Sequence, residues 1–187
     1  NSNDLVYLLE GVTGSGKTEV YIKLVKETIA SGKSALILVP EISLTPVMLN
    51  RFYTLFEKNV AILHSELTSG EKYDEYRRIL RGEAKVVIGT RSAIFAPLNN
   101  IGIIIIDEEH VESYKQDNTP CYHAREVAIM RAKHFSGCKV LLGSATPSLE
   151  SEARAYKGVY HHLKMLKRVN EKELPKTEIV SLQNFKN

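Results

Sequence analysis

The stretch "GVTGSGKT", residues 11–18, decides the fold, because it satisfies the pattern G-x-x-x-x-G-K-[ST]. It follows the short apolar run Val6–Leu9 and precedes residues 17–30, whose apolar side chains recur at helical spacing before Gly32. A strand, a glycine-rich turn and a helix in this order bind phosphate, since backbone N–H groups and the positive end of the helix dipole meet the anion. A chance glycine-rich turn is the alternative, and the flanking elements disfavour it. The sequence therefore predicts a nucleotide site at this loop.

Two side chains of this loop have predicted chemical roles. Lys17 would reach the β- and γ-phosphates of ATP, and the hydroxyl of Thr18 would bind Mg²⁺. The other residues of the loop would surround the phosphates, and they are Gly11, Val12, Thr13, Gly14, Ser15 and Gly16. The predicted cofactors are therefore ATP and Mg²⁺.

Short apolar runs alternate with helical patterns along the rest of the chain. Further strands are expected at Ala35–Val39, Val60–Leu63, Val86–Ile88, Ile103–Ile106 and Val140–Leu142, and further helices at 45–57, 69–81, 123–135 and 148–157. Strands that are apolar throughout are buried on both faces. With helices as crossovers, they predict an α/β fold, a doubly wound parallel sheet with helices on both faces. Ligands of such sheets bind at the carboxyl ends of the strands.

Three acids and a histidine follow the run Ile103–Ile106. Asp107 stands where a phosphate-loop ATPase carries its second Mg²⁺-binding group, at the end of a neighbouring buried strand. Glu108 is predicted to orient or deprotonate the water that attacks the γ-phosphate. We interpret Glu109 as a solvated acid. We expect His110 to join the catalytic group by coupling the nucleotide site to a neighbouring element, and an ordinary surface histidine is the alternative.

The length and composition of the sequence fit one domain, which we expect at residues 1–163. The charged segment 164–187 is expected to be an exit linker. Apolar residues make up 43% and charged residues 25%, which is typical of a globular chain. A net charge of +3 permits nucleic-acid binding without indicating it. The first residues do not read as a signal peptide, and the sequence has no apolar run of the roughly 18 residues that cross a membrane. Cys121 and Cys138 form no CxxC pair, so neither zinc nor a disulfide is predicted, and we expect a cytoplasmic protein without a membrane partner.

Three further motifs stand at predicted strand ends: "PEISLTP" (40–46), "GTRSA" (89–93) and "GSATPS" (143–148). With the phosphate loop and "DEEH", they resemble the motifs of superfamily 2 helicases, the DEAD/DEAH-like motors, in the expected order. The resemblance implies the first RecA-like lobe of an ATP-dependent motor that moves on single-stranded DNA. It implies DNA contacts or coupling roles for Pro40, Ser43, Thr45, Thr90, Arg91, Ser92, Ser144 and Thr146.

A narrower resemblance, to the replication-restart helicases, is carried by "SYKQ", "YHAR" and "SATPSLES". It implies 3′-to-5′ unwinding at stalled forks and an aromatic-rich loop that senses DNA. In that loop, DNA contact or coupling is expected of Tyr114, Lys115, Gln116, Tyr122, His123 and Arg125. Aromatic faces stack on bases and basic groups meet phosphates, while packing of Tyr114 and Tyr122 onto the domain is an equal alternative. Cys121 departs from the arginine expected before "YHAR", which leaves that arginine's contact in question.

The resemblance also implies parts beyond these residues, so we expect the chain to be one lobe of a longer protein. Those parts are a second lobe with an arginine finger, zinc-binding cysteine clusters and an N-terminal DNA-binding domain. Forked DNA, primosome proteins and single-strand-binding protein are the expected partners, and the lobe alone should be nearly inactive. The alternatives are another superfamily 2 motor, such as a restriction translocase or DNA-uptake ATPase, and a non-catalytic nucleotide-binding module. Glu108 and Ser144–Thr146 disfavour a small-molecule kinase.

Overall fold

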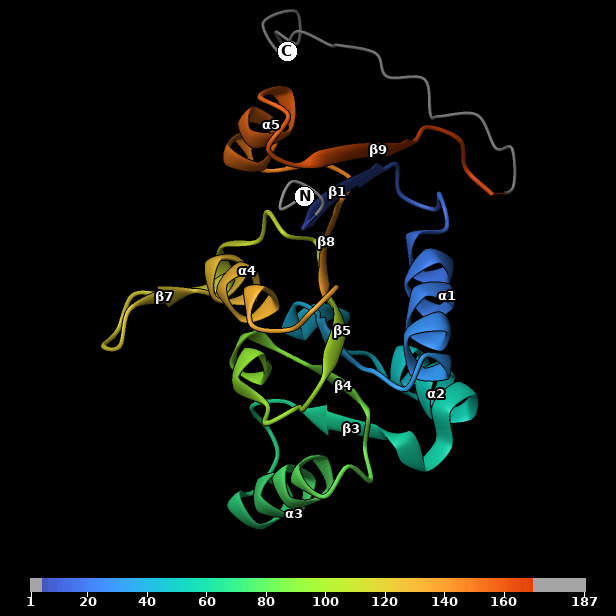
Figure 1. Ribbon diagram of the computed structural model, residues 1–187, viewed down its shortest axis with the longest axis vertical. Coiled ribbons are helices and arrows are strands. Elements are labelled where there is room, and N and C mark those ends of the chain that lie inside the picture. The colour runs from blue at the N-terminus through green and yellow to red at the C-terminus, as the bar shows by residue number, and fades with distance from the viewer. Residues whose placement is uncertain (1–4, 170–187) are drawn as a thin grey trace, which may run out of the picture.

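Seven parallel strands form the central sheet, in the order β3-β4-β2-β5-β8-β1-β9 (Figure 1). The structure is a computed structural model that describes residues 5–169. The strands are β1 (Val6–Gly11), β2 (Ser34–Leu38), β3 (Val60–Leu63), β4 (Val86–Gly89), β5 (Ile101–Asp107), β8 (Lys139–Ser144) and β9 (His161–Met165). The predicted doubly wound parallel sheet is confirmed.

Helices cover both faces of this sheet, as Figure 1 shows. On one face lie α1 (Lys17–Ala30) and α2 (Pro46–Phe56), and on the other lie α3 (Ser69–Leu80), α4 (Ala124–Lys133) and α5 (Leu149–Tyr156). Short 3₁₀ turns occur at Glu41–Ser43, Glu57–Asn59, Arg91–Phe95 and Glu112–Tyr114. Each predicted helix and strand is present, with ends within two residues of the expected positions.

Side chains alternate between the two faces of each strand, and helices cover both faces of the sheet. The predicted strands therefore read as continuous apolar runs in the sequence. In β2, Leu36 and Leu38 pack into the core on the side of α3 and α4, whereas Ala35 and Ile37 pack into the core on the side of α1 and α2. All four are fully buried. A strand covered on both faces has no solvent side that would require polar residues.

Strand β9 was not predicted. It lies at one edge of the sheet and pairs in parallel with β1, with Lys164 opposite Glu10 and Met165 opposite Gly11. Its residues are half-buried or exposed, so the sequence "HHLKM" lacks the apolar run of a central strand. Two residues of the expected linker therefore belong to the sheet, while 170–187 lie outside the described residues and the division at 163/164 stays a prediction.

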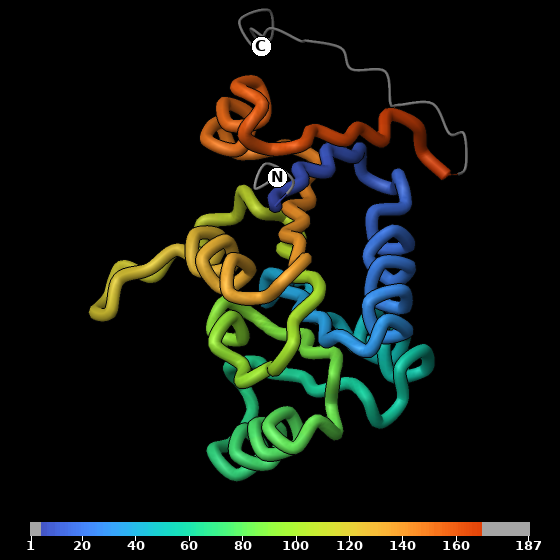
Figure 2. Tube along the Cα trace, in the orientation of Figure 1, coloured from blue at the N-terminus to red at the C-terminus, as the bar shows by residue number. Residues whose placement is uncertain are grey.

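A two-stranded antiparallel hairpin, β6 (Lys115–Gln116) and β7 (Tyr122–His123), extends away from the central sheet (Figures 1 and 2). It connects the end of β5 to the start of α4. The hairpin therefore stands between the acids that follow β5 and the helix that packs behind them. No helix within residues 5–169 has the length and apolar character needed to cross a bilayer.

Candidate nucleotide and nucleic-acid site

The phosphate loop connects β1 to α1 at the carboxyl edge of the sheet. Gly14 and Gly16 have φ angles of 80° and 91°, a left-handed backbone that side chains disfavour. Gly16 is also the N-cap of α1 and has no side chain to bond the free N–H groups of the first turn. The residues of that first turn line a cavity of about 390 Å³, which Asp107 and Glu108 also line. This geometry suits an anion bound at a helix N-terminus.

Lys17 lies between the loop and the acids. Its Nζ donates to the carbonyl of Gly11 at 2.8 Å and lies 3.8 Å from Oε1 of Glu108. Ser15 is buried and its Oγ has no hydrogen-bond partner in this structure. The Ser15 hydroxyl packs closely against Gly11, and only a glycine leaves room for it there, because a Cβ at position 11 would lie 2.6 Å from Ser15 Oγ. The loop thus presents an ammonium and an unpaired hydroxyl around a cavity, which fits phosphate oxygens.

Two tyrosines hold Asp107. The hydroxyl of Tyr21 donates to Oδ1 of Asp107 at 2.8 Å, and the hydroxyl of Tyr114 donates to the backbone carbonyl of Asp107 at 2.7 Å. Burial raises the pKa of the Asp107 carboxyl, and the bond from Tyr21 opposes that shift. Burial also raises the pKa of both tyrosines, so they stay protonated donors at neutral pH. Tyr21 was missed in the sequence, although it follows Lys17 by four residues and therefore shares its helix face.

Glu108 adopts a left-handed backbone with a φ of 47°, which is rare for a residue with a side chain. This conformation turns the chain at the end of β5. Oε2 of Glu108 lies 3.7 Å from Nδ1 of His110, and that ring nitrogen is 2.8 Å from Oγ of Ser144. Ser144 Oγ also accepts from the backbone N–H of Thr146 at 2.9 Å. His110 thus lies between Glu108 and Ser144, the last residue of β8, and its coupling role stays a prediction.

The interpretation of Glu109 as a solvated acid was wrong, because its side chain is fully buried. The backbone N–H of Glu109 donates to the carbonyl of Gly143 at 3.0 Å, which continues the pairing with β8 and turns the side chain inward. Its carboxylate accepts from Arg125 at 3.2 Å, from the N–H of Ser148 at 2.7 Å and from Ser151 at 2.8 Å. Sequence reasoning has no rule that pairs residues 109 and 125, so this network could not be foreseen.

The predicted DNA-sensing residues divide into buried and accessible groups. Tyr114 is 1% exposed and Arg125 is 3% exposed, so neither offers a surface for DNA in this structure. The packing alternative therefore describes Tyr114, and Arg125 belongs to the network around Glu109. Half-buried Tyr122 meets Phe95 edge-on at 5.0 Å and lies under the guanidinium of Arg91 at 5.8 Å.

The accessible part is the hairpin itself. Lys115 is exposed and pairs with Asp117 at 2.8 Å, and Nε2 of Gln116 donates to the carbonyl of Pro120 at 3.0 Å. His123 instead caps α4, because its Nδ1 accepts from the backbone N–H of Arg125. Exposed Cys121 makes a contact within the hairpin, to the carbonyl of Asp117. Among the predicted loop residues, Lys115 and Gln116 are thus the candidates for direct contact.

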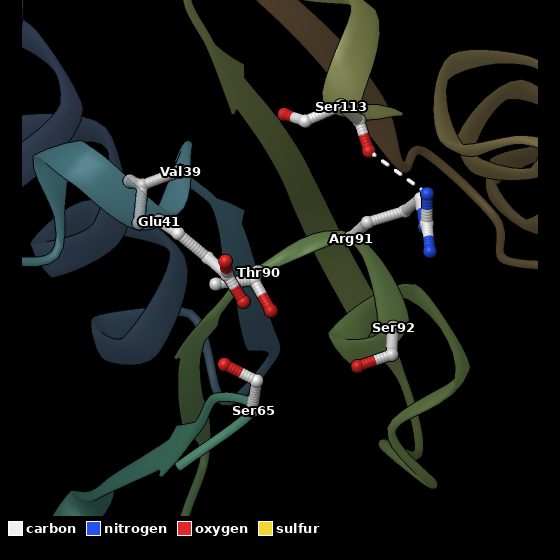
Figure 3. A pocket seen from close by; sticks show the side chains of 7 residues that line it. All are labelled: Val39, Glu41, Ser65, Thr90, Arg91, Ser92 and Ser113. Atoms are coloured by element: carbon white, nitrogen blue, oxygen red, sulfur yellow. Dashed lines mark hydrogen bonds between the residues drawn. The ribbon is translucent and has the colours of Figure 1, made fainter. Parts of the chain in front are cut away.

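A second cavity, of about 230 Å³, opens between the ends of β2, β3 and β4 (Figure 3). It is lined by Val39, Glu41, Ser65, Thr90, Arg91, Ser92 and Ser113. Figure 3 shows Arg91 directed toward the loop at Ser113, where its guanidinium donates to the carbonyls of Ser113 at 3.2 Å and Lys115 at 2.7 Å. The structure therefore brings the predicted residues Thr90, Arg91 and Ser92 to one cavity, and Arg91 reaches the first residue of the hairpin.

Three other residues with predicted DNA-contact or coupling roles lie on the loop after the neighbouring strand β2. Pro40 is buried, Ser43 is half-buried and Thr45 is exposed. Thr45 Oγ1 also caps α2 by accepting from the N–H of Met48 at 3.3 Å. Glu41 of the same loop lines the cavity with Thr90, Arg91 and Ser92, so the loops after β2 and β4 share one edge of the sheet.

The family model of the DEAD/DEAH box helicases matches residues 2–155. The chain belongs to the DEAD/DEAH box helicase family. Its similar relatives include the Replication restart protein PriA of Bacillus subtilis (strain 168), 58% identical over 95% of this chain and 22% of the relative. The protein of the same name from Synechocystis is 51% identical over 94% of this chain and 22% of the relative. This helicase-family chain therefore spans about a fifth of the length of these curated relatives.

Solved structures support the same fold. The Hef helicase domain of Pyrococcus furiosus matches 87% of this helicase-family chain and 35% of its own, with a TM-score of 0.60 and 18% identity. RecG bound to a three-way DNA junction matches 90% of this chain and 21% of its own, with a TM-score of 0.58 and 26% identity. The predicted RecA-like architecture is thereby confirmed.

Proposed function

We propose that this chain is the ATP-binding motor lobe of a 3′-to-5′ DNA helicase that restarts stalled replication forks. The observation that carries the proposal is the shared cavity in which the phosphate loop faces Asp107 and Glu108. The names of the relatives similar over 94–95% of this chain supply the biological context. In this function the lobe couples ATP hydrolysis to translocation on single-stranded DNA.

The residues around the cavity fit Mg²⁺. Thr18 and Asp107 offer the hydroxyl and carboxylate oxygens that this cation prefers. Within residues 5–169 no group of three or more His, Cys, Asp or Glu side chains could enclose a metal. Mg²⁺ commonly takes one or two protein oxygens together with the phosphates of its substrate. When bound, the cation neutralises charge on the β- and γ-phosphates.

The protein's own residues then divide the chemistry. Lys17 binds the phosphates, and in doing so it exchanges its contact with Glu108 for the nucleotide. Glu108 is thereby free to orient the attacking water and to accept its proton, as a general base does. His110 lies 3.7 Å from Glu108 and 2.8 Å from Ser144, a position from which it would couple the acid to the end of β8.

A continuous set of contacts supports coupling between DNA and this chemistry. Arg91 lines the cavity that we propose for the DNA strand and donates to the carbonyls on both sides of Tyr114. Tyr114 in turn bonds the carbonyl of Asp107. A displacement of Arg91 by a bound strand would thus reach the metal-binding acid through one side chain.

The whole-protein partners follow from the same proposal. A second lobe of the same chain would supply the arginine finger, which is worth ~10³–10⁵ in turnover in related enzymes. Single-stranded or forked DNA is the nucleic-acid partner, with primosome proteins and single-strand-binding protein as further partners. We place the protein in the cytoplasm and zinc in another part of the parent protein.

Nucleotide binding and turnover test the proposal. The full-length protein should bind an ATP analogue with a requirement for Mg²⁺, hydrolyse ATP faster with single-stranded DNA and displace a strand in the 3′-to-5′ direction. Strand displacement with the opposite polarity, or translocation without displacement, would favour another superfamily 2 motor. Binding without turnover would favour the non-catalytic nucleotide-binding module.

A further inference from the structure

We propose that Tyr21 is a positioning residue for the magnesium site, whose hydroxyl fixes the orientation of the Asp107 carboxylate. This inference rests on the proposed nucleotide function and adds a residue to it. The hydroxyl of Tyr21 donates to Oδ1 of Asp107 at 2.8 Å across the space between α1 and the end of β5. Tyr21 is 1% exposed, so its hydroxyl is shielded from competing water.

Helix α1 places three functional side chains on one face. Lys17 and Thr18 lie in its first turn, and Tyr21 follows them by four and three residues, the spacings that bring side chains together on a helix. The element that presents the ammonium and the hydroxyl to the nucleotide thus also holds the acid opposite. A shift of α1 relative to β5 would change all three positions together.

The space for the Tyr21 hydroxyl depends on a glycine in the neighbouring strand. Gly143 of β8 stands opposite Asp107 of β5 in the sheet. A Cβ at Gly143 would lie 1.8 Å from the Tyr21 hydroxyl oxygen, which no side chain could tolerate without displacing the tyrosine. Tyr21 is therefore seated in a gap between two strand ends, and its hydroxyl has one described acceptor, Asp107.

Mg²⁺ makes such an anchor useful, because it demands near-octahedral geometry and short, fixed ligand distances. A carboxylate held at one oxygen cannot turn freely about its last side-chain bond. Loss of the anchor should therefore weaken the metal-dependent part of nucleotide binding and spare the part contributed by the phosphate loop. A residue that only filled space would change the Mg²⁺-dependent and the Mg²⁺-independent nucleotide affinity together, or would change neither.

The test compares Tyr21→Phe with wild type in the full-length protein, because phenylalanine keeps the buried ring and removes the hydroxyl. A fluorescent ATP analogue is titrated without Mg²⁺, and its binding is then followed as a function of Mg²⁺. We expect the half-saturating Mg²⁺ concentration to rise roughly tenfold, the lower end of effects on metal affinity from residues that hold a ligand. Affinity without Mg²⁺ should stay within about twofold of wild type.

A matched control is Tyr160→Phe, since Tyr160 is also buried and its hydroxyl bonds Arg154 at 2.7 Å, outside the nucleotide cavity. That variant should leave both quantities unchanged. An unchanged Mg²⁺ requirement in Tyr21→Phe would overturn the inference, and so would an equal loss of affinity without Mg²⁺. Failure of wild type to bind the nucleotide, or of Asp107→Asn to alter the Mg²⁺ requirement, would instead refute the proposed function. Thermal unfolding of both tyrosine variants checks that each is folded.

Discussion

At the residue scale, the nucleotide site consists of charged groups that the fold places close together before any ligand arrives. Lys17 and Glu108 are 3.8 Å apart, and Glu108 has a strained backbone. The positions of Lys17, Thr18 and Asp107 could be predicted, since each follows from a motif and the strand beside it. The burial of Glu109 could not, because it depends on pairing that continues beyond the last residue of β5.

Substitution of the two central residues should separate binding from hydrolysis. In the full-length protein, Glu108→Gln should abolish turnover and preserve Mg²⁺–ATP binding, because the amide keeps the shape of the acid and cannot accept a proton. Lys17→Ala should weaken both nucleotide binding and turnover, because the ammonium stabilises the negative charge of the phosphates in the ground state and in the transition state. Nucleotide titration beside steady-state ATPase measures this, and an active Glu108→Gln enzyme would remove Glu108 from its role.

The buried pair Glu109–Arg125 should matter for stability. Glu109→Ala removes the fully buried carboxylate partner of Arg125 and leaves it with more exposed ones. These remaining partners are Glu126 and Glu150. Loss of one partner of a buried pair typically costs ~3–5 kcal/mol in unfolding free energy, and the remaining partners place the expected loss at the lower end. Glu83→Ala is the control, because Glu83 and its partner Arg81 are both more than half exposed, and such pairs contribute ~0–1 kcal/mol. Urea unfolding at neutral pH compares the two, and equal losses would show that the buried pair has no special role.

Asp107 should lower stability in the absence of Mg²⁺. Burial raises its pKa in the folded state above the ordinary 3.8, so ionisation favours the unfolded chain as pH rises through this range. Asp107→Asn should therefore increase the unfolding free energy at pH 7 relative to wild type, and the gain should shrink as pH falls toward 4. Urea unfolding across that pH range in EDTA measures this, and a gain that grows toward low pH would contradict the assigned cause.

At the element scale, parallel strands bring loops that are distant in sequence to one edge. The loops after β1, β2, β4, β5 and β8 could be assigned to that edge because the apolar runs predicted the strands. The hairpin β6–β7 and strand β9 could not be predicted from the sequence, each for its own reason. The hairpin has only two residues on each side, and β9 lies at the sheet edge with polar side chains.

The hairpin yields a prediction in which two neighbouring residues act differently. Tyr114→Phe removes the bond to the Asp107 carbonyl and should change the ratio of DNA-stimulated to basal ATPase more than it changes DNA affinity. Exposed Lys115→Ala should mainly weaken DNA binding, with a shallower salt dependence because one phosphate contact is lost. ATPase rate against single-strand concentration, paired with binding titrations at fixed salt, separates these effects. A normal stimulation ratio in Tyr114→Phe would exclude coupling through its hydroxyl.

At the scale of the whole molecule, the lobe presents the nucleotide cavity and the Arg91 cavity along one edge of a single sheet. Its family resemblance could be predicted from motif order alone, because each motif follows a strand in that sheet. The contacts between motifs could not, since the bonds of Tyr21, Tyr114 and Arg91 join residues from separate elements.

The most direct measurement is steady-state ATP hydrolysis with and without single-stranded DNA, by the full-length protein and by residues 1–187. We predict DNA-stimulated turnover by the full-length protein and a rate at least ~10³ lower for residues 1–187, because no second lobe supplies an arginine to the transition state. Robust DNA-stimulated turnover by residues 1–187, or no stimulation of the full-length protein, would contradict the assignment of this chain as one half of a helicase ATP site.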